Sequence, residues 1–182
     1  MPMKFKIIKD SNPIMKKKSL PVDLPLSQED RDTLDWMLDY LKKSQDEECA
    51  KKHNIRPGIG LAAIQIGLLK RMFVIYYGEG EDLVQYQLVN PKIIEYSLRK
   101  CALKDGEGCL SVDSEHPGYA HRYYKIKIKA FDALTNQEVV ITARGFDAIV
   151  LQHEYDHLDG LFFYDRIDKN KPNVQLMNEE LI

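Results

Sequence analysis

Three things are scarce in this sequence of 182 residues: long apolar runs, cysteine, and an excess of one charge. No stretch approaches the roughly 20 apolar residues that cross a bilayer, and the opening MPMKFKIIKD lacks the apolar core of a secretion signal. Three cysteines are too few for a disulfide framework. A net charge of −2 gives no overall attraction to nucleic acid. We therefore expect a cytoplasmic protein with no membrane partner and no specific nucleic-acid binding.

The remaining composition is that of an ordinary globular protein. Hydrophobic residues make up 44% and charged residues 30% of the chain, which is enough apolar material for a core. The sequence contains no internal repeat and no low-complexity linker. We expect one domain spanning residues 1–182.

The first clear element is an amphipathic helix. Ser27, followed three residues later by Asp30, is typical of a helix N-terminus. Apolar residues then recur at the spacing of one helix face, at Leu34, Met37, Leu38 and Leu41. The pattern predicts a long helix that runs to about Lys52.

The middle of the chain is rich in predicted strands, at 71–77, 83–90, 92–97, 119–132 and 137–144. Lys125, Lys127 and Lys129 alternate with apolar residues, which is the period of a half-buried strand, and 132–136 resembles a hairpin turn. The basic, aromatic run HRYYKIKIK could also suggest RNA binding. We favour the strand with a solvated lysine face, because charge runs are weak signals.

A second predicted helix carries the residues most typical of chemistry. Its apolar stripe of Phe146, Ile149 and Val150 continues into His153 and His157, and Gly160 can end it. A single histidine on such a face is usually a core residue. Two histidines one turn apart, with Glu154 between them, form the HExxH pattern, in which both rings converge on one metal ion and the glutamate holds a water molecule.

The third ligand remains open from these residues alone. In the extended zinc-protease pattern Gly160 fits, but Phe163 replaces the third histidine. After His157 the only remaining candidates for a third ligand are carboxylates. They lie in a short exit segment and tail: Asp159, Asp165, Asp168, Glu179 and Glu180. Upstream, Cys109 lies among glycines in the stretch DGEGCLS, and a thiolate with two imidazoles makes a three-ligand site. Alternatively, Cys109 is a small buried hydrophobe, as we expect for Cys49 and Cys101.

Three blocks of the chain resemble the signature blocks of the peptide deformylase family, in the same order and with similar spacing. They are GIGLAAIQ at 58–65, EGCLS at 107–111 and HEYDH at 153–157. The resemblance covers nearly the whole chain and is to the bacterial branch with longer insertions. Ile64 departs from the proline common in that branch, which could loosen the loop without removing a catalytic group.

The apolar stripe of the second helix and the strand-rich middle predict an α+β fold, in which β-strands surround a central helix that carries the HExxH motif, plus a long N-terminal helix. The resemblance implies removal of the N-formyl group from the initiator methionine of new polypeptides, with formate released and a possible transient ribosome contact. Cys109, His153 and His157 would bind one divalent metal, Fe2+ in the cell, with Zn2+, Ni2+ or Co2+ possible in purified protein. Ligand chemistry alone also permits zinc.

Further residues receive roles from this resemblance and from their spacing. A metal-bound water attacks the formyl carbon while Glu154 takes its proton, and the Gln65 amide and the Leu110 N–H meet the formyl oxygen. Residues on the ligand face and in the glycine block are candidates for the methionine pocket, although each could be core: Gly58, Ile59, Gly60, Phe146, Ile149 and Val150. We expect Glu107 and Asp156 to accept hydrogen bonds from groups around the metal ligands, and Arg122 to pair with one of these two acids.

Two rival functions stay open. One is a zinc peptidase that uses HEYDH with a downstream glutamate. The other is a ribosome-associated binding module without activity.

Overall fold

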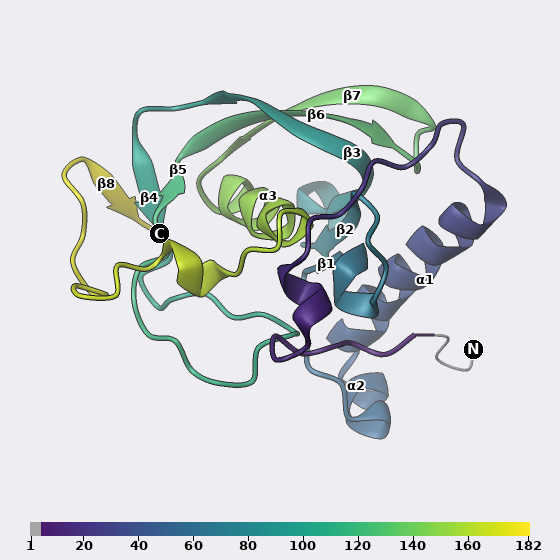
Figure 1. Cartoon of the computed structure of the whole chain (residues 1–182), viewed down its shortest axis with the longest axis horizontal. Coiled ribbons are helices and arrows are strands. Elements are labelled where there is room, and N and C mark those ends of the chain that lie inside the picture. Colours follow the sequence, from purple (N-terminus) through teal and green to yellow (C-terminus); the bar gives the residue numbers. More distant parts are fainter. Residues whose placement is uncertain (1–4) are drawn as a thin grey trace.

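The computed structural model describes residues 5–182, which contain three α-helices and eight β-strands (Figure 1). The strands form two sheets. The expectation of a mixed α+β fold is confirmed. None of the helices in the described part is long and apolar enough to cross a membrane.

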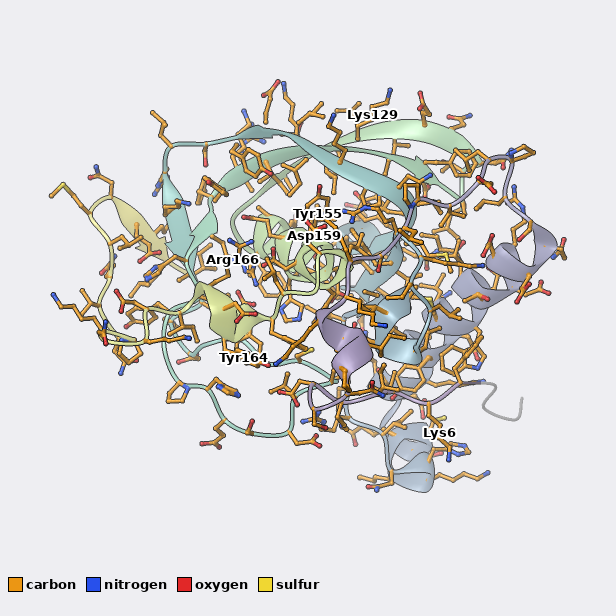
Figure 2. All side chains as sticks on the ribbon, in the orientation of Figure 1. Lys6, Lys129, Tyr155, Asp159, Tyr164 and Arg166 are labelled. Carbon is orange, nitrogen blue, oxygen red and sulfur yellow. The ribbon has the colours of Figure 1, made fainter. Side chains whose placement is uncertain are left out.

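The larger sheet has five strands in the order β1-β2-β3-β6-β7, all antiparallel. Their bounds are β1 Gly60–Ala62, β2 Met72–Tyr77, β3 Val84–Tyr96, β6 Lys125–Asp132 and β7 Gln137–Arg144. In β6, Ile126 and Ile128 are buried while Lys129 points away from the core (Figure 2). The separate strands expected at 83–90 and 92–97 are one strand, because a register shift between Val89 and Lys92 lets pairing continue past a proline.

The smaller sheet has three strands in the order β5-β4-β8, formed by β5 Arg122–Tyr123, β4 Lys100–Ala102 and β8 Glu179–Leu181. The single strand expected over 119–132 is wrong, since β5 and β6 belong to different sheets. No pattern predicted β8, which pairs in parallel with β4 and brings the carboxyl end of the chain to this sheet.

The first predicted helix is two helices, α1 Gln28–Gln45 and α2 Glu47–His53, so the expectation of one helix to Lys52 is wrong. Ser27 caps α1, its side chain accepting from the Asp30 N–H at 3.1 Å. The helix breaks at Asp46, where the backbone is extended and the side chain accepts from the Cys49 N–H at 2.7 Å. Cys49 is therefore half-buried near the surface and not a core residue, whereas Cys101 is buried.

Strand β2 is buried on both faces, which explains its continuous apolar sequence MFVIYY. Met72 and Val74 pack against the apolar stripe of α1. Phe73 and Ile75 point to the opposite face and join the core that includes α3, Gly145–Leu158. Figure 1 shows α3 between the two sheets, with α1 on the outside.

Helix α3 is buried on nearly every side, so the expectation of a single core-facing stripe is too narrow. It contacts strands of both sheets. Phe146, at its start, is 38% exposed, whereas Ile149 and Val150 are 2% and 5% exposed. Past its end, Gly160 has φ +73°, and a Cβ there would lie 2.5 Å from the Lys16 carbonyl oxygen. Glycine is required at this position to let the chain turn away.

Candidate metal centre

Helix α3 and the loop after β4 bring a thiol and two imidazoles together. The rings of His153 and His157 have centroids 5.0 Å apart, and Cys109 Sγ lies 3.3 Å from His157 Nε2. One donor atom from each of the three residues lies within 4.8 Å of the others. One sulfur and two nitrogens at this spacing fit a tetrahedral metal site with one open position. Within residues 5–182 this is the one cluster of three such ligands that we find.

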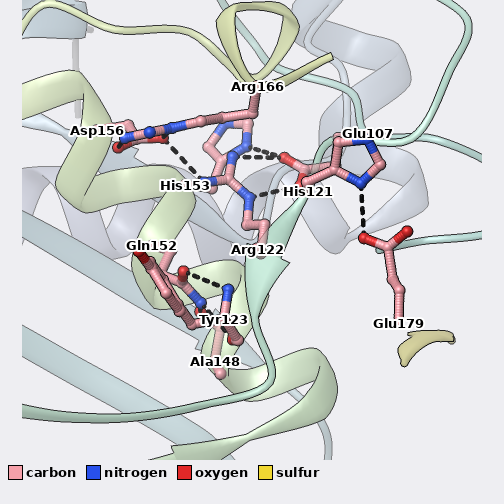
Figure 3. Close-up of polar contacts among 10 residues, drawn as sticks. All are labelled: Glu107, His121, Arg122, Tyr123, Ala148, Gln152, His153, Asp156, Arg166 and Glu179. Atoms are coloured by element: carbon pink, nitrogen blue, oxygen red, sulfur yellow. Dashed lines mark hydrogen bonds and ion pairs between the residues drawn. The ribbon is translucent and has the colours of Figure 1, made fainter. Parts of the chain in front are cut away.

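A network of charged side chains, buried except for Arg166, orients His153 (Figure 3). His153 Nδ1 lies 2.8 Å from Glu107 Oε2, which leaves Nε2 for a metal. Arg122 donates two hydrogen bonds to Glu107, at 2.7 and 3.0 Å, and one to Asp156 at 2.9 Å. Arg166 completes the network with two bonds to Asp156, at 3.0 and 2.6 Å. The sequence left open which acid Arg122 meets, and the structure places it between both.

The charged groups of this network shift the pKa values of the side chains within it. Burial works against ionisation of Glu107, but Arg122 and His153 outweigh it and lower the pKa of Glu107 to about 2. Burial lowers the pKa of His157 well below its ordinary value, so this ring is neutral and able to bind a metal. Burial also opposes charge on His153, yet Cys109 and Glu107 raise its pKa well above the ordinary value.

Glu154 lies beside the ligands with its carboxylate enclosed. It is 4% exposed, and its Oε2 has no hydrogen-bond partner among the described residues. Burial raises the pKa of Glu154 to about 7, a value suited to taking and returning a proton near neutral pH. Gly60 is needed next to it, because a Cβ there would collide with the Glu154 carboxylate.

The two predicted hydrogen-bond donors, the Gln65 side-chain amide and the Leu110 N–H, lie next to Cys109. Gln65 is 1% exposed, and its Oε1 accepts from the Ala62 N–H at 2.8 Å. Its Nε2 donates to Ser111 Oγ at 3.0 Å and lies 3.5 Å from Cys109 Sγ. Leu110 follows Cys109 in a tight turn closed by the Val112 N–H on the Cys109 carbonyl, at 3.2 Å. In the preceding block Ile64, which stands in place of a proline, is fully buried.

These groups open into a cavity of about 340 Å³. Its walls include the predicted pocket residues together with the catalytic candidates: Gly58, Ile59, Gly60, Gln65, Glu107, Cys109, Leu110, Phe146, Ile149, Val150, His153 and Glu154. Arg56, Pro57, Leu103 and Gly108 also line the cavity and were not singled out from the sequence. Arg56 and Pro57 directly precede the block at 58–65 and Gly108 lies within the block at 107–111, which are signals that could have been used, whereas Leu103 gives none.

The downstream carboxylates that could have served a zinc peptidase are engaged elsewhere. Glu179 Oε1 lies 2.6 Å from His121 Nδ1 (Figure 3), and Asp159 pairs with Arg71 at 2.9 Å. Neither belongs to the ligand cluster.

Comparison with known proteins identifies the family. The model of the family described as polypeptide deformylase matches residues 4–173. The chain is 49% identical over 168 residues to "Peptide deformylase" of Macrococcus caseolyticus, and the match covers 91% of both chains. It is 48% identical over 167 residues to "Peptide deformylase 2" of Geobacillus stearothermophilus, and that match covers 91% of this chain and 90% of that protein. The solved peptide deformylase of Ehrlichia chaffeensis superposes with a TM-score of 0.72 at 30% identity, covering 92% of this chain and 90% of that one. The chain belongs to the peptide deformylase family.

Proposed function

We propose that this chain carries out its family's reaction at the centre formed by Cys109, His153 and His157. The reaction is hydrolysis of the N-formyl group from the initiator methionine of newly made polypeptides, with release of formate. The observation that carries the proposal is the cluster of three candidate ligands, of which Cys109 and His153 line a cavity together with Glu154.

The family uses a divalent metal, which when bound polarises the formyl carbonyl and lowers the pKa of water. Cys109, His153 and His157 would hold it. We propose Fe2+ in the cell, with Zn2+, Ni2+ or Co2+ able to occupy the same ligands in purified protein. Metal analysis of protein purified without oxygen tests this identity, and an absence of iron would contradict it.

The residues of the chain handle the protons and the developing charge. Glu154 takes a proton from the attacking water as the carbon–oxygen bond forms, and returns it to the amine nitrogen as the carbon–nitrogen bond breaks. The Gln65 amide and the Leu110 N–H donate to the formyl oxygen as it gains negative charge. Such preorganised donors are typically worth about 3 kcal/mol each.

The methionine side chain occupies the apolar part of the cavity in this proposal. Ile149 and Val150 lie one turn before His153 on α3, and residues at this spacing share a helix face. Gly58 and Gly60 form another part of the wall, where glycine allows close packing: a Cβ at Gly58 would lie 2.6 Å from Leu110 Cδ1. Phe146 forms the exposed rim of the cavity, and its ring packs edge-on against that of Tyr77 with the ring centroids 5.5 Å apart.

In this proposal residues 1–182 form one catalytic domain, with α3 as the central catalytic helix and α1 as the long N-terminal helix. The contacts of α3 with strands of both sheets support that arrangement. The substrates are formylated nascent peptides, met in the cytoplasm during a transient contact with the ribosome, without a membrane or specific nucleic-acid partner.

The test is formate release from a formyl-Met-Ala-Ser peptide, measured without oxygen on protein whose metal content is known. We expect formate in proportion to bound metal and no cleavage of the unformylated peptide. Peptide-bond cleavage in place of formate release would favour the zinc-peptidase rival. Metal-loaded protein without any turnover would favour the non-catalytic module.

A further inference from the structure

We propose that Arg56 is a positioning residue for deformylation, because its guanidinium holds and polarises the peptide group between Cys109 and Leu110. This inference rests on the proposed function, since it requires the Leu110 N–H to face the formyl oxygen. Arg56 itself touches no reacting atom in this proposal.

Arg56 fastens the ligand loop to the opposite wall of the cavity. Its Nη2 donates to the carbonyl oxygens of Leu110 at 2.8 Å, Cys109 at 3.1 Å and Val112 at 3.2 Å. Its Nη1 lies 3.3 Å from the Val112 oxygen. Arg56 directly precedes Pro57 and the glycine block that forms the facing wall. Arg56 therefore bridges the two walls, as Gln65 does through its contact with Ser111.

The contact with the Cys109 carbonyl has a specific electronic consequence. That carbonyl and the Leu110 N–H belong to the same peptide group, whose atoms are conjugated. A cation that accepts electron density from the oxygen makes the N–H a stronger donor, as in other hydrogen-bond chains. Within residues 5–182 no protein acceptor is found for the Leu110 N–H, and Leu110 lines the cavity. The N–H is thus available to a substrate.

Lys9 offers a matched control. Its Nζ donates to the Leu110 carbonyl at 3.1 Å and to Asp113 at 2.8 Å. Arg56 makes both of these contacts too, with Asp113 at 3.1 Å. Only Arg56 also reaches the Cys109 carbonyl, the oxygen of the peptide group whose N–H is the proposed donor. Lys9→Gln and Arg56→Gln each remove one cation from the same loop. They differ in the contacts of Arg56 with the Cys109 and Val112 carbonyls, and only the Cys109 carbonyl belongs to the peptide group of the proposed donor.

The first experiment separates kcat from KM. For metal-loaded Arg56→Gln we expect kcat on the formyl-Met peptide to fall about tenfold, part of the value of a whole oxyanion donor, with KM within about twofold of wild type. Arg56→Lys keeps the charge but loses the planar fork, and we expect it to recover part of kcat. Lys9→Gln should stay within about twofold of wild type in both constants.

The second experiment needs no turnover. Cys109–Leu110 is the one Cys–Leu pair in the sequence, so carbonyl-13C cysteine with 15N leucine gives a single NMR cross-peak for this peptide group. In zinc-loaded protein we expect the Leu110 amide proton to move to lower frequency in Arg56→Gln, as its hydrogen-bonding strength falls. Lys9→Gln should leave that proton nearly unchanged.

Several results would overturn the inference. Equal kinetic effects of Arg56→Gln and Lys9→Gln would show that the Cys109 contact has no special role. A raised KM with normal kcat would make Arg56 a substrate contact, and loss of metal would make it a structural support for the ligand loop. Wild-type protein that releases no formate would instead contradict the proposed function, so the two failures are distinguishable.

Discussion

The two faces of the five-stranded sheet are stabilised by different interactions. On the α1 face, Leu34, Met37 and Leu41 are fully buried against apolar side chains. Around α3 the buried groups include charges, with Arg122 2% exposed between Glu107 and Asp156. Apolar contacts are non-directional and tolerate exchange, whereas each buried charge needs its own partner. The α1 face serves stability, and the α3 face also sets the geometry of the proposed metal centre.

The largest expected effect is Glu154→Gln on turnover. Glutamine keeps the shape of the side chain but cannot accept the proton of water, so kcat should fall about a thousandfold. Metal content should stay at the wild-type level, because Glu154 is not among the three ligands. Kinetics with metal analysis check both statements. Turnover near wild type in metal-loaded Glu154→Gln would remove Glu154 from the reaction.

Arg122→Met tests whether the α3 face depends on paired charge. The change leaves Glu107 and Asp156 buried with one cation fewer, which should lower the free energy of unfolding by about 3–5 kcal/mol and metal affinity by about 10- to 100-fold. Denaturant unfolding and a metal competition assay measure the two losses.

Arg166→Met is the control. Arg166 contacts the same Asp156, but its side chain is 43% exposed, so we expect the free energy of unfolding to fall by about 1 kcal/mol or less. Equal losses would contradict this account.

Leu41→Ala provides the opposite case on the α1 face. Truncating this fully buried side chain should destabilise the fold by about 2–5 kcal/mol through lost burial and a cavity. The metal stoichiometry and the kcat of the folded fraction should not change, because α1 carries none of the ligands. A loss of metal affinity in Leu41→Ala would show that the two faces are coupled.

Val150→Phe has the most selective effect. Val150 lines the cavity, and narrowing it should reduce turnover of formyl-Met peptides while leaving metal bound. In wild type, formyl-Met and formyl-norleucine peptides should exceed formyl-Asp and formyl-Lys peptides, because an aliphatic slot gains from buried methylenes and cannot pair a charge. Val140→Phe, at a 58% exposed position of β7, is the control. An unchanged substrate ranking in Val150→Phe would place the pocket near Gly58–Gly60.

The same contrast explains what the sequence could predict. Period-two alternation from Lys125 to Lys129 located β6, and the spacing of Leu34 to Leu41 located α1, because these patterns are local. The break at Asp46 was missed because residues that favour helices stand on both sides of it. Strand β8 and the Arg56 contacts depend on partners tens of residues away, which spacing does not encode. The three sequence blocks indicated the ligands, but the path from Glu107 through Arg122 to Asp156 required the fold.

The central claim is that Cys109 completes the metal site with the two histidines of α3. Cobalt titration of metal-free protein tests it most directly, because a thiolate bound to Co2+ gives a sulfur-to-metal charge-transfer absorption that imidazoles and carboxylates do not. We expect one Co2+ per wild-type chain with this absorption, and in Cys109→Ala no such band and strongly weakened binding. Tight binding of one Co2+ by Cys109→Ala, with a spectrum equal to that of wild type, would contradict the account.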